Sequence, residues 1–342
     1  AAKEYQIAIP LWRKLKMEAE HANTLTNRAY VLAQHGHFEA ARRLMRDALA
    51  LRQRLGFRGP LALTLNALAR IELFAGEYLK AEQYATRALR IAEQVQFRRG
   101  IGLAHITLAS CYRFMSEPPL AQKERRQLLQ KALEHSDKAL KIFSEEVEEP
   151  ERLGEAYYVR GIIHREFCRK PLLPGVNVEE HSRQAEEDLE KAKEIAWKNE
   201  FWGHYFDVAM GQAWLYYYLS EEGKLQAHLQ KIEDEIRSRF PAYLITEKRL
   251  PEVQDDTLLG IFTQIARMHV LKGVQAMDAF ERSEKKPPYE ELKTAAREFT
   301  IAMEYDHLIA EDFRDLRRAM NVIYERLKGL NAREMKAFYE SV

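Results

Sequence analysis

Two similar segments, 40 positions apart, decide the fold of this chain. Residues 25–51 read LTNRAYVLAQHGHFEAARRLMRDALAL, and residues 65–91 read LNALARIELFAGEYLKAEQYATRALRI. The segments are identical at six pairs of positions, which are Leu25 and Leu65, Ala29 and Ala69, Gly36 and Gly76, Ala41 and Ala81, Ala48 and Ala88, and Leu49 and Leu89. Self-similarity at a period of this length is typical of a solenoid of stacked units. We therefore expect an all-α repeat protein, in which each unit packs on its neighbours.

Within each segment, the apolar spacing predicts two helices separated by a turn. Apolar residues recur at helical spacing up to Gly36 and resume at Ala41. Glycine adopts a positive φ without steric cost, so we expect Gly36 and Gly76 to end the first helix of each pair. Ala41 and Ala48 are small, which predicts a close approach between the two helices.

Three features of the second segment resemble a known family. They are the run Gly76, Tyr78 and Ala81, the run Ala88, Leu89 and Ile91, and the pair Leu68 and Ala69. The two runs resemble the second half of a tetratricopeptide repeat, and the pair matches its first helix. The resemblance implies a right-handed superhelical solenoid that binds ligands in a concave groove. Repeats of this length are similar to those in the sensor regions of bacterial signal-transduction ATPases (STAND-type) and transcription regulators.

The period of 40 residues departs from the usual tetratricopeptide period of 34. The additional residues follow the second helix, at 53–60 and 93–100, where longer helices or loops would accommodate them. Residues 1–240 predict a tetratricopeptide-like solenoid with about five helix pairs of about 40–50 residues each. Residues 241–342 predict divergent helical repeats and a C-terminal cap, with helices at 256–282, 289–304, 307–328 and 332–340.

The N-terminal residues fall in register with the second helices of the repeat. Ala8, Ile9 and Leu11 lie 40 positions before Ala48, Leu49 and Leu51. Residues 2–20 therefore predict an orphan second helix without a first helix before it, kinked at Pro10. Half a repeat indicates that the chain is a fragment of a longer protein, and an atypical N-terminal cap is the alternative.

The composition favours a globular protein of a reducing compartment. Hydrophobic residues make up 46% of the 342 residues, and no apolar run approaches the length of a membrane span. Cys111 and Cys168 are too few for a disulfide framework. Because the chain also opens without a secretion signal, we expect a cytoplasmic protein with no membrane partner.

The charge is unevenly distributed along the chain. Residues 1–100 hold 17 Lys and Arg against 9 Asp and Glu, a net charge of +8, and the remainder carries −7. The two ends are either differently charged solvated surfaces, or the basic end makes a polar contact with another domain or protein. Nucleic acid is a poor third candidate, because Glu39 and Asp47 accompany the arginines of this region.

The sequence offers no catalytic or metal-binding motif. Cys111 and His105 lie six positions apart on one helix, which points them in different directions and predicts a buried structural cysteine. His35 and His37 could offer two imidazoles, but no further ligand joins them and a turn is the better interpretation. Neither phosphate-binding glycine motif is present. We therefore predict no catalytic residue, no metal and no cofactor, and a chain that is not an enzyme.

The candidate binding residues follow from the resemblance, because the first helices of tetratricopeptide repeats line the concave groove. Their groove-facing positions correspond here to Thr26, Tyr30, Asn66, Arg70, Ser110, Arg113, Tyr158, Arg165, Asp207 and Trp214. An arginine fork suits a carboxylate or phosphate, and asparagine can pair with a backbone amide. The alternative is that these residues merely solvate the surface.

These features predict a non-enzymatic binding module, the sensor or effector-recognition region of a larger signal-transduction protein. Its expected partner is a protein or peptide segment or a small acidic effector, and a nucleotide-binding domain of the same parent protein is a further candidate. A constitutive protein–protein scaffold is one alternative. The other is an accessory region of an enzyme whose catalytic domain lies outside this chain.

Overall fold

The computed structural model of this protein describes residues 2–34, 36–117, 119–239, 259–283 and 290–309. Within these ranges the chain forms thirteen helices and no strand. No helix in these ranges combines the length and apolar character that crossing a membrane requires. The chain divides into two compact units, Ala1–Glu222 and Gly223–Val342. This division lies one helix before the predicted boundary at residue 240.

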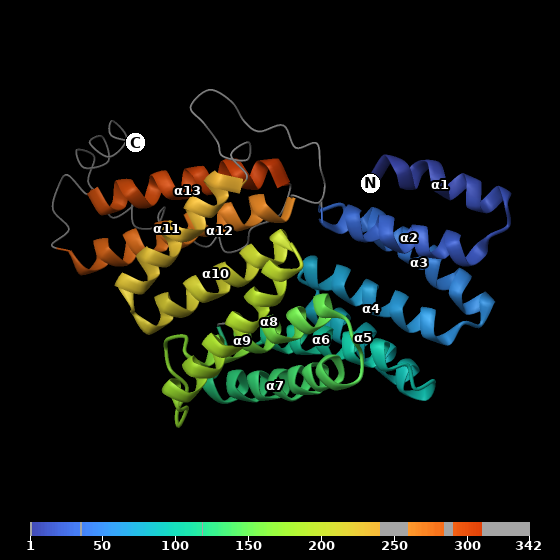
Figure 1. Ribbon diagram of the computed structural model, residues 1–342, viewed down its shortest axis with the longest axis horizontal. Coiled ribbons are helices and arrows are strands. Elements are labelled where there is room, and N and C mark those ends of the chain that lie inside the picture. The colour runs from blue at the N-terminus through green and yellow to red at the C-terminus, as the bar shows by residue number, and fades with distance from the viewer. Residues whose placement is uncertain (1, 35, 118, 240–258, 284–289, 310–342) are drawn as a thin grey trace. The chain divides into compact units, whose positions relative to one another are not determined.

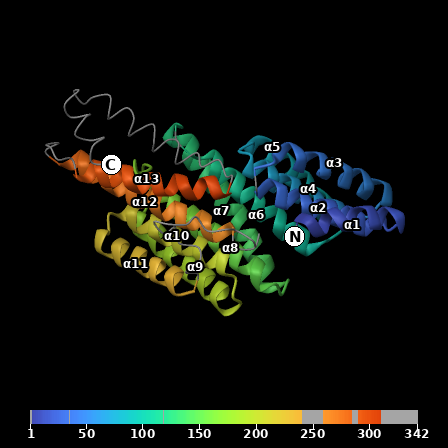
Figure 2. The same cartoon turned by 90° about the horizontal axis from the view of Figure 1, so that it is seen from above.

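The first unit is a succession of antiparallel helix pairs (Figures 1 and 2). Its helices are α1 (Ala2–Lys14), α2 (Glu18–Gln34), α3 (Phe38–Leu55), α4 (Arg58–Phe74), α5 (Tyr78–Gln94), α6 (Arg98–Met115), α7 (Gln122–Glu145), α8 (Pro150–Phe167), α9 (Val178–Lys198) and α10 (Trp202–Leu219). Helix α2 pairs with α3, α4 with α5, α6 with α7 and α8 with α9, and each pair contacts the next. The first helices α2, α4, α6, α8 and α10 also contact one another in that order. The predicted all-α solenoid of helix pairs is confirmed.

The turns within the first two pairs repeat the same geometry 40 positions apart. Gly36 and Gly76 adopt φ values of 75° and 72°. The same two backbone bonds close each turn: Gly36 N to Ala33 O (3.0 Å) and His37 N to Leu32 O (2.8 Å), then Gly76 N to Leu73 O (3.0 Å) and Glu77 N to Glu72 O (2.8 Å). The predicted helix-ending role of both glycines is therefore confirmed.

The turns between pairs follow the same 40-residue period through their backbone conformation. Lys16, Gly56 and Gln96 all adopt a left-handed conformation, with φ values of 56°, 72° and 53°. Only one of the three is a glycine, so the residue types do not reveal that this left-handed conformation recurs every 40 residues. Helix α3 ends at Leu55 and α4 begins at Arg58, which assigns the additional residues of the period to longer helices and not to loops.

This backbone period corrects the prediction of one N-terminal helix over residues 2–20. Helix α1 ends at Lys14, and α2 begins at Glu18. The left-handed residue Lys16 interrupts the helix there, as Gly56 does one period later. Helix α1 is nevertheless the positional equivalent of α3, as its register predicted. Pro10 lies inside α1.

Small residues let the helices of each pair approach closely. Ala29, Ala69 and Ala109 are completely buried on the first helices of three successive pairs. Gly161 takes this place on α8, where an added Cβ would lie 2.9 Å from Cγ of Leu189 on α9. Since interiors are close-packed, the side chain at this position sets the spacing between the two helices.

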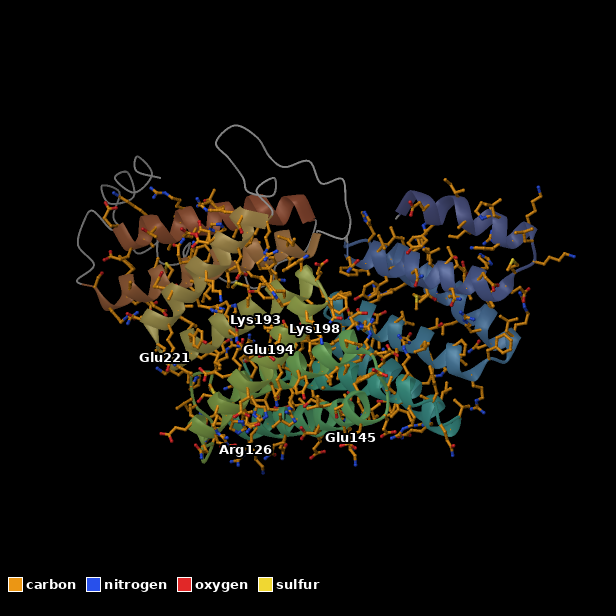
Figure 3. All side chains as sticks on the ribbon, in the orientation of Figure 1. Arg126, Glu145, Lys193, Glu194, Lys198 and Glu221 are labelled. Atoms are coloured by element: carbon orange, nitrogen blue, oxygen red, sulfur yellow. The ribbon has the colours of Figure 1, made fainter. Side chains whose placement is uncertain are left out.

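The later pairs of the first unit have irregular connections. Helix α7 begins at Gln122, and Arg126 and Glu145 lie near its two ends (Figure 3). Asn177 caps α9 by accepting a hydrogen bond from the amide of Glu180 at 3.2 Å. The turn that follows α10 lies at Ser220, which adopts a φ of 60°.

The second unit contains α11 (Glu222–Arg239) from Gly223 onward, α12 (Leu259–Arg282) and α13 (Glu290–Ile309). Lys272 on α12 donates to Glu233 on α11 at 2.9 Å. Helices α12 and α13 pack so closely that an added Cβ at Gly273 would lie 2.8 Å from the Phe299 ring. Helix α13 continues to Ile309, so the predicted break between 304 and 307 is wrong. The predicted helix at 332–340 lies outside the described residues.

Candidate functional site

The candidate binding residues lie on the first helices of the first unit, and four of them enter two polar clusters. We call the surface formed by α2, α4, α6, α8 and α10 the first-helix face. The bridge cluster consists of Tyr30, Arg70, Arg152 and Glu155. The arginine cluster consists of Arg113, Glu117, Arg125, Arg165, Glu166, Arg169 and Tyr218.

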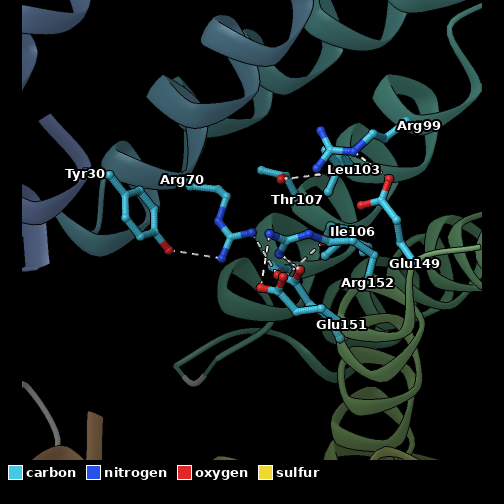
Figure 4. A network of polar contacts seen from close by, with 11 residues as sticks. Tyr30, Arg70, Arg99, Leu103, Ile106, Thr107, Glu149, Glu151 and Arg152 are labelled. Atoms are coloured by element: carbon cyan, nitrogen blue, oxygen red, sulfur yellow. Dashed lines mark hydrogen bonds and ion pairs between the residues drawn. The ribbon is translucent and has the colours of Figure 1, made fainter. Parts of the chain in front are cut away.

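The bridge cluster joins helices that are not neighbours in the stack. The guanidinium of Arg70 on α4 donates from Nη1 to Glu155 Oε1 on α8 at 2.8 Å, and from Nη2 to the Tyr30 hydroxyl on α2 at 3.1 Å (Figure 4). Arg152 donates to the other oxygen of Glu155 at 2.6 Å. The bond from α4 to α8 passes over the intervening pair α6 and α7. The first helices therefore line the inner side of a curved stack.

The charges of the bridge cluster are largely removed from solvent. The side chains of Arg70 and Glu155 are 26% and 16% exposed. Burial favours the protonated form of Glu155, but Arg70 and Arg152 outweigh it and lower the pKa of this carboxyl to about 2. Glu155 therefore remains ionised at neutral pH and holds both arginines.

The arginine cluster surrounds the buried carboxylate of Glu166, near the C-terminal ends of α6, α8 and α10. Arg165 Nη2 donates to Glu166 Oε1 at 2.7 Å, and Arg169 Nη1 lies 3.5 Å from Oε2. Arg113 Nη1 lies 3.9 Å from Glu117 Oε1. Arg125 donates to the carbonyl oxygen of Glu166 at 2.7 Å. Three guanidiniums thus lie around the carboxylates of Glu166 and Glu117, whereas Arg125 binds backbone carbonyl oxygens.

Electrostatic coupling confirms that these groups act on one another. Burial alone would raise the pKa of Glu166, but Arg165, Arg169 and Arg113 together hold it below the usual value. The pKa of Arg169 is raised, since Tyr218, Glu166 and Glu117 outweigh the effect of burial. The negative charge of Glu117 therefore acts on Arg169 as well as on Arg113.

Aromatic rings flank the arginine cluster. The Arg113 guanidinium lies 3.6 Å from the centroid of Phe114, which stacks on Tyr78 at 5.2 Å. Arg165 and Arg169 lie 5.7 and 5.8 Å from the Tyr218 ring. Trp214 is 5.9 Å from Tyr218. Guanidinium groups commonly stack on aromatic rings. In this part of the face, guanidinium groups and aromatic rings therefore lie next to one another.

The remaining predicted residues lie outside these two clusters. Asn66 is 5% exposed, and its buried Oδ1 accepts no hydrogen bond from the described residues. Tyr158 packs edge-on against His204, with ring centroids 5.4 Å apart. Thr26 and Ser110 donate to carbonyl oxygens one turn earlier, at 2.9 and 3.1 Å. Asp207 on α10 is partly exposed.

Sequence reasoning missed the acidic residues of both clusters. Glu155 and Glu166 lie on α8, 11 positions apart, which is about three helical turns and therefore one face. This spacing is visible in the sequence, but their arginine partners come from other helices and could not be assigned from it. Glu166 also follows the candidate Arg165 directly.

Both cysteines and His105 of the first unit are buried. Burial raises the pKa of Cys111 and of Cys168 to about 12, which suppresses the reactive thiolate. Nδ1 of His105 lies 2.8 Å from Nδ1 of His135, so this ring does not face Cys111 as a base. Where residues are described, no three His, Cys, Asp or Glu side chains gather to hold a metal ion. His35 lies outside the described residues.

The first-helix face is thus a surface of partly buried arginines, carboxylates and aromatic rings contributed by successive helix pairs. Neither the known protein-family models nor the curated proteins provide a match for this sequence.

Proposed function

We propose that this chain is a non-enzymatic recognition module of tetratricopeptide-like repeats, the ligand-sensing region of a larger cytoplasmic signalling protein. A peptide or protein segment, or a small acidic effector, would bind in a concave groove along the first-helix face. A nucleotide-binding domain of the same parent protein is a candidate partner for the module.

One observation carries this proposal: arginines and aromatic rings from five successive first helices gather on a single face. A solenoid presents such a face as an extended binding surface. The guanidiniums are largely but not completely buried, since the side chains of Arg70, Arg113 and Arg169 are 26%, 14% and 31% exposed. Partly desolvated arginines bind carboxylates and phosphates more strongly than solvated ones do.

The bridge cluster suggests how binding would be transmitted. Arg70 holds α4 to α8 through Glu155 at 2.8 Å, across one helix pair. A ligand carboxylate that takes the place of Glu155 would release this contact and favour a more open stack. Such a ligand shifts the equilibrium by its difference in affinity for the two forms.

The experiment is a selection of binding peptides followed by comparison of two arginine variants. A display library of random 12-residue peptides is selected on the immobilised protein, and the affinity of the recovered peptides is measured by fluorescence polarisation. We expect Arg113→Ala to weaken binding about tenfold, the loss of one charge-assisted contact.

The matched control is Arg87→Ala on α5, an exposed arginine outside the first-helix face. This variant should bind like the wild type, and circular dichroism should show the same helix content in all three proteins. Failure to recover any peptide, or equal affinities for both variants, contradicts the proposal.

A further inference from the structure

We propose that the arginine cluster anchors an anionic group, a carboxylate or a phosphate, that is attached to an aromatic or other planar ring. This inference rests on the proposed function and deepens it, because it names the chemical class of the ligand. It draws on three properties of the cluster, which are its excess of positive charge, its internal carboxylate and its aromatic borders.

The first property is an excess of guanidinium groups over carboxylates. Arg113, Arg165 and Arg169 share Glu166 and Glu117, whereas Arg125 donates to backbone carbonyl oxygens. Among the described residues, Arg165 alone of these makes a short bond to a carboxylate, at 2.7 Å, while the guanidinium of Arg113 donates no hydrogen bond and that of Arg169 donates one, at 3.5 Å. Since a guanidinium carries five N–H donors, both have donor capacity left for an anion.

These two arginines are also more exposed to solvent than the other charged groups around Glu166. Arg169 and Arg113 are 31% and 14% exposed, whereas Arg165 and Glu166 are 11% and 6% exposed. Arg113 comes from α6, and Arg169 follows the C-terminal end of α8. An anion between them would therefore join two successive helix pairs.

The second property is an internal carboxylate, that of Glu117, which lies where the anion of a ligand would bind. Its carboxylate lies 3.9 Å from Arg113, too far for a hydrogen bond, and its negative charge also acts on Arg169. The side chain is 27% exposed and follows the C-terminal end of α6. A ligand carboxylate or phosphate that displaces Glu117 could approach both guanidiniums to hydrogen-bonding distance, with bidentate geometry.

The third property selects a ligand that carries a ring. Phe114 lies under Arg113 at 3.6 Å, and Tyr218 lies beside Arg165 and Arg169 at 5.7 and 5.8 Å. Trp214 extends this border at 5.9 Å from Tyr218. Phe114 already lies between Arg113 and Tyr78, so a planar group attached to the anion would stack on Tyr218 or Trp214, which adds affinity that a bare anion lacks. The negative ends of the α6 and α8 dipoles oppose anions, so the guanidiniums must supply the attraction.

The test is isothermal titration calorimetry of the full chain with four probes. Phenyl phosphate and benzoate carry a ring, and inorganic phosphate and acetate are their counterparts without one. We expect saturable 1:1 binding of at least one ring-bearing probe, about tenfold tighter than its counterpart. Tighter binding of phenyl phosphate identifies a phosphate ligand, and tighter binding of benzoate identifies a carboxylate.

Two variants of opposite effect exclude misfolding as an explanation. Arg169→Gln should weaken binding about tenfold, because it removes a charge-assisted contact. Glu117→Gln should strengthen binding about fivefold, because it removes the competing carboxylate. Arg87→Gln on α5 carries the same charge change as Arg169→Gln away from the site and should leave binding unchanged.

The proposal is overturned if no probe binds saturably to the wild type or to Glu117→Gln. It is also overturned if Arg169→Gln and Arg87→Gln weaken binding equally, or if the ring-bearing probes bind no more tightly than their counterparts without a ring. Peptides selected on the first-helix face that bind without any acidic residue would overturn the anion site alone. The recognition module proposed above would then still stand.

Discussion

Mildly acidic pH should destabilise the first unit through two histidine pairs packed between helices. Nδ1 of His105 lies 2.8 Å from Nδ1 of His135, and the same distance separates Nδ1 of His164 from Nδ1 of His181. One ring of each pair must accept the hydrogen bond and therefore stays neutral. Burial, reinforced by the partner histidine, lowers the pKa of His105 and of His164 to about 3.

The sign of the effect follows from these pKa values. Both folded pKa values lie below the unfolded value of 6.5, so the stabilisation is complete above pH 6.5 and decreases as the pH falls toward 3. At pH 5.5, one unit below the unfolded pKa, each histidine costs about 1.4 kcal/mol of unfolding free energy. Together the two cost about 3 kcal/mol. The charged groups that face the pairs are Lys131, Lys138 and Arg160, which add to the effect, and Glu82, Glu134 and Glu180, which oppose it.

The assay is urea unfolding followed by circular dichroism at pH 7.5 and pH 5.5, at constant ionic strength. The double variant His105→Asn/His164→Asn removes both rings and keeps an amide that can hydrogen-bond in place of Nδ1. The double variant should lose about 3 kcal/mol less than the wild type between the two pH values, and the loss that remains comes from groups such as His135 and His181, whose pKa burial also lowers. The exposed His37→Asn should behave like the wild type. An equal loss in the wild type and the double variant would refute the reasoning.

Three further predictions concern the stability of the first unit, each measured by urea unfolding. Gly161→Ala should lower the free energy of unfolding by about 1–3 kcal/mol, because its Cβ would lie 2.9 Å from Leu189. Gly203→Ala, which has open space around it, should leave this free energy unchanged or raise it. Equal effects of the two substitutions would contradict this. Gln96→Gly should stabilise the fold by about 1 kcal/mol, and Gly56→Ala should destabilise it by a similar amount, since both residues adopt a left-handed backbone conformation. No change in either variant would show that this conformation does not affect stability. Arg160→Ala should lower the free energy of unfolding by about 3–5 kcal/mol, because it leaves the buried carboxylate of Asp188 without the arginine that binds it through two contacts of 2.7 Å. The control Asp137→Asn removes a 61% exposed partner of Arg160 and should cost less than about 1 kcal/mol, and comparable losses would contradict the burial argument.

The helix pairs could be predicted from the sequence because their signals are local. Gly36 and Gly76 end first helices, and the completely buried alanines repeat on each helix, since both effects depend on residue type. The boundary of α1 could not be predicted, because Lys16 takes the left-handed conformation without being a glycine. For the same reason, the left-handed conformation of Gln96 could not be predicted from the sequence.

The candidate site was only partly predictable, since its geometry arises from contacts between distant repeats. Tyr30 and Arg70 were correctly expected on neighbouring first helices, and the structure joins them at 3.1 Å. Their partner Glu155 lies 85 positions after Arg70 and is reached only through the curvature of the stack. Asn66 lies one turn before Arg70 but is buried, which side-chain type alone does not indicate.

The bond between Arg70 and Glu155 has a consequence for how the first unit unfolds. In a one-dimensional array, stability is a sum of repeat energies and nearest-neighbour couplings, and the ends can fray independently. This ion pair adds a next-nearest-neighbour coupling, because it connects α4 with α8 across the pair between them. Three consecutive repeats are thereby tied into one cooperative block, so loss of the middle pair releases both of its neighbours at once.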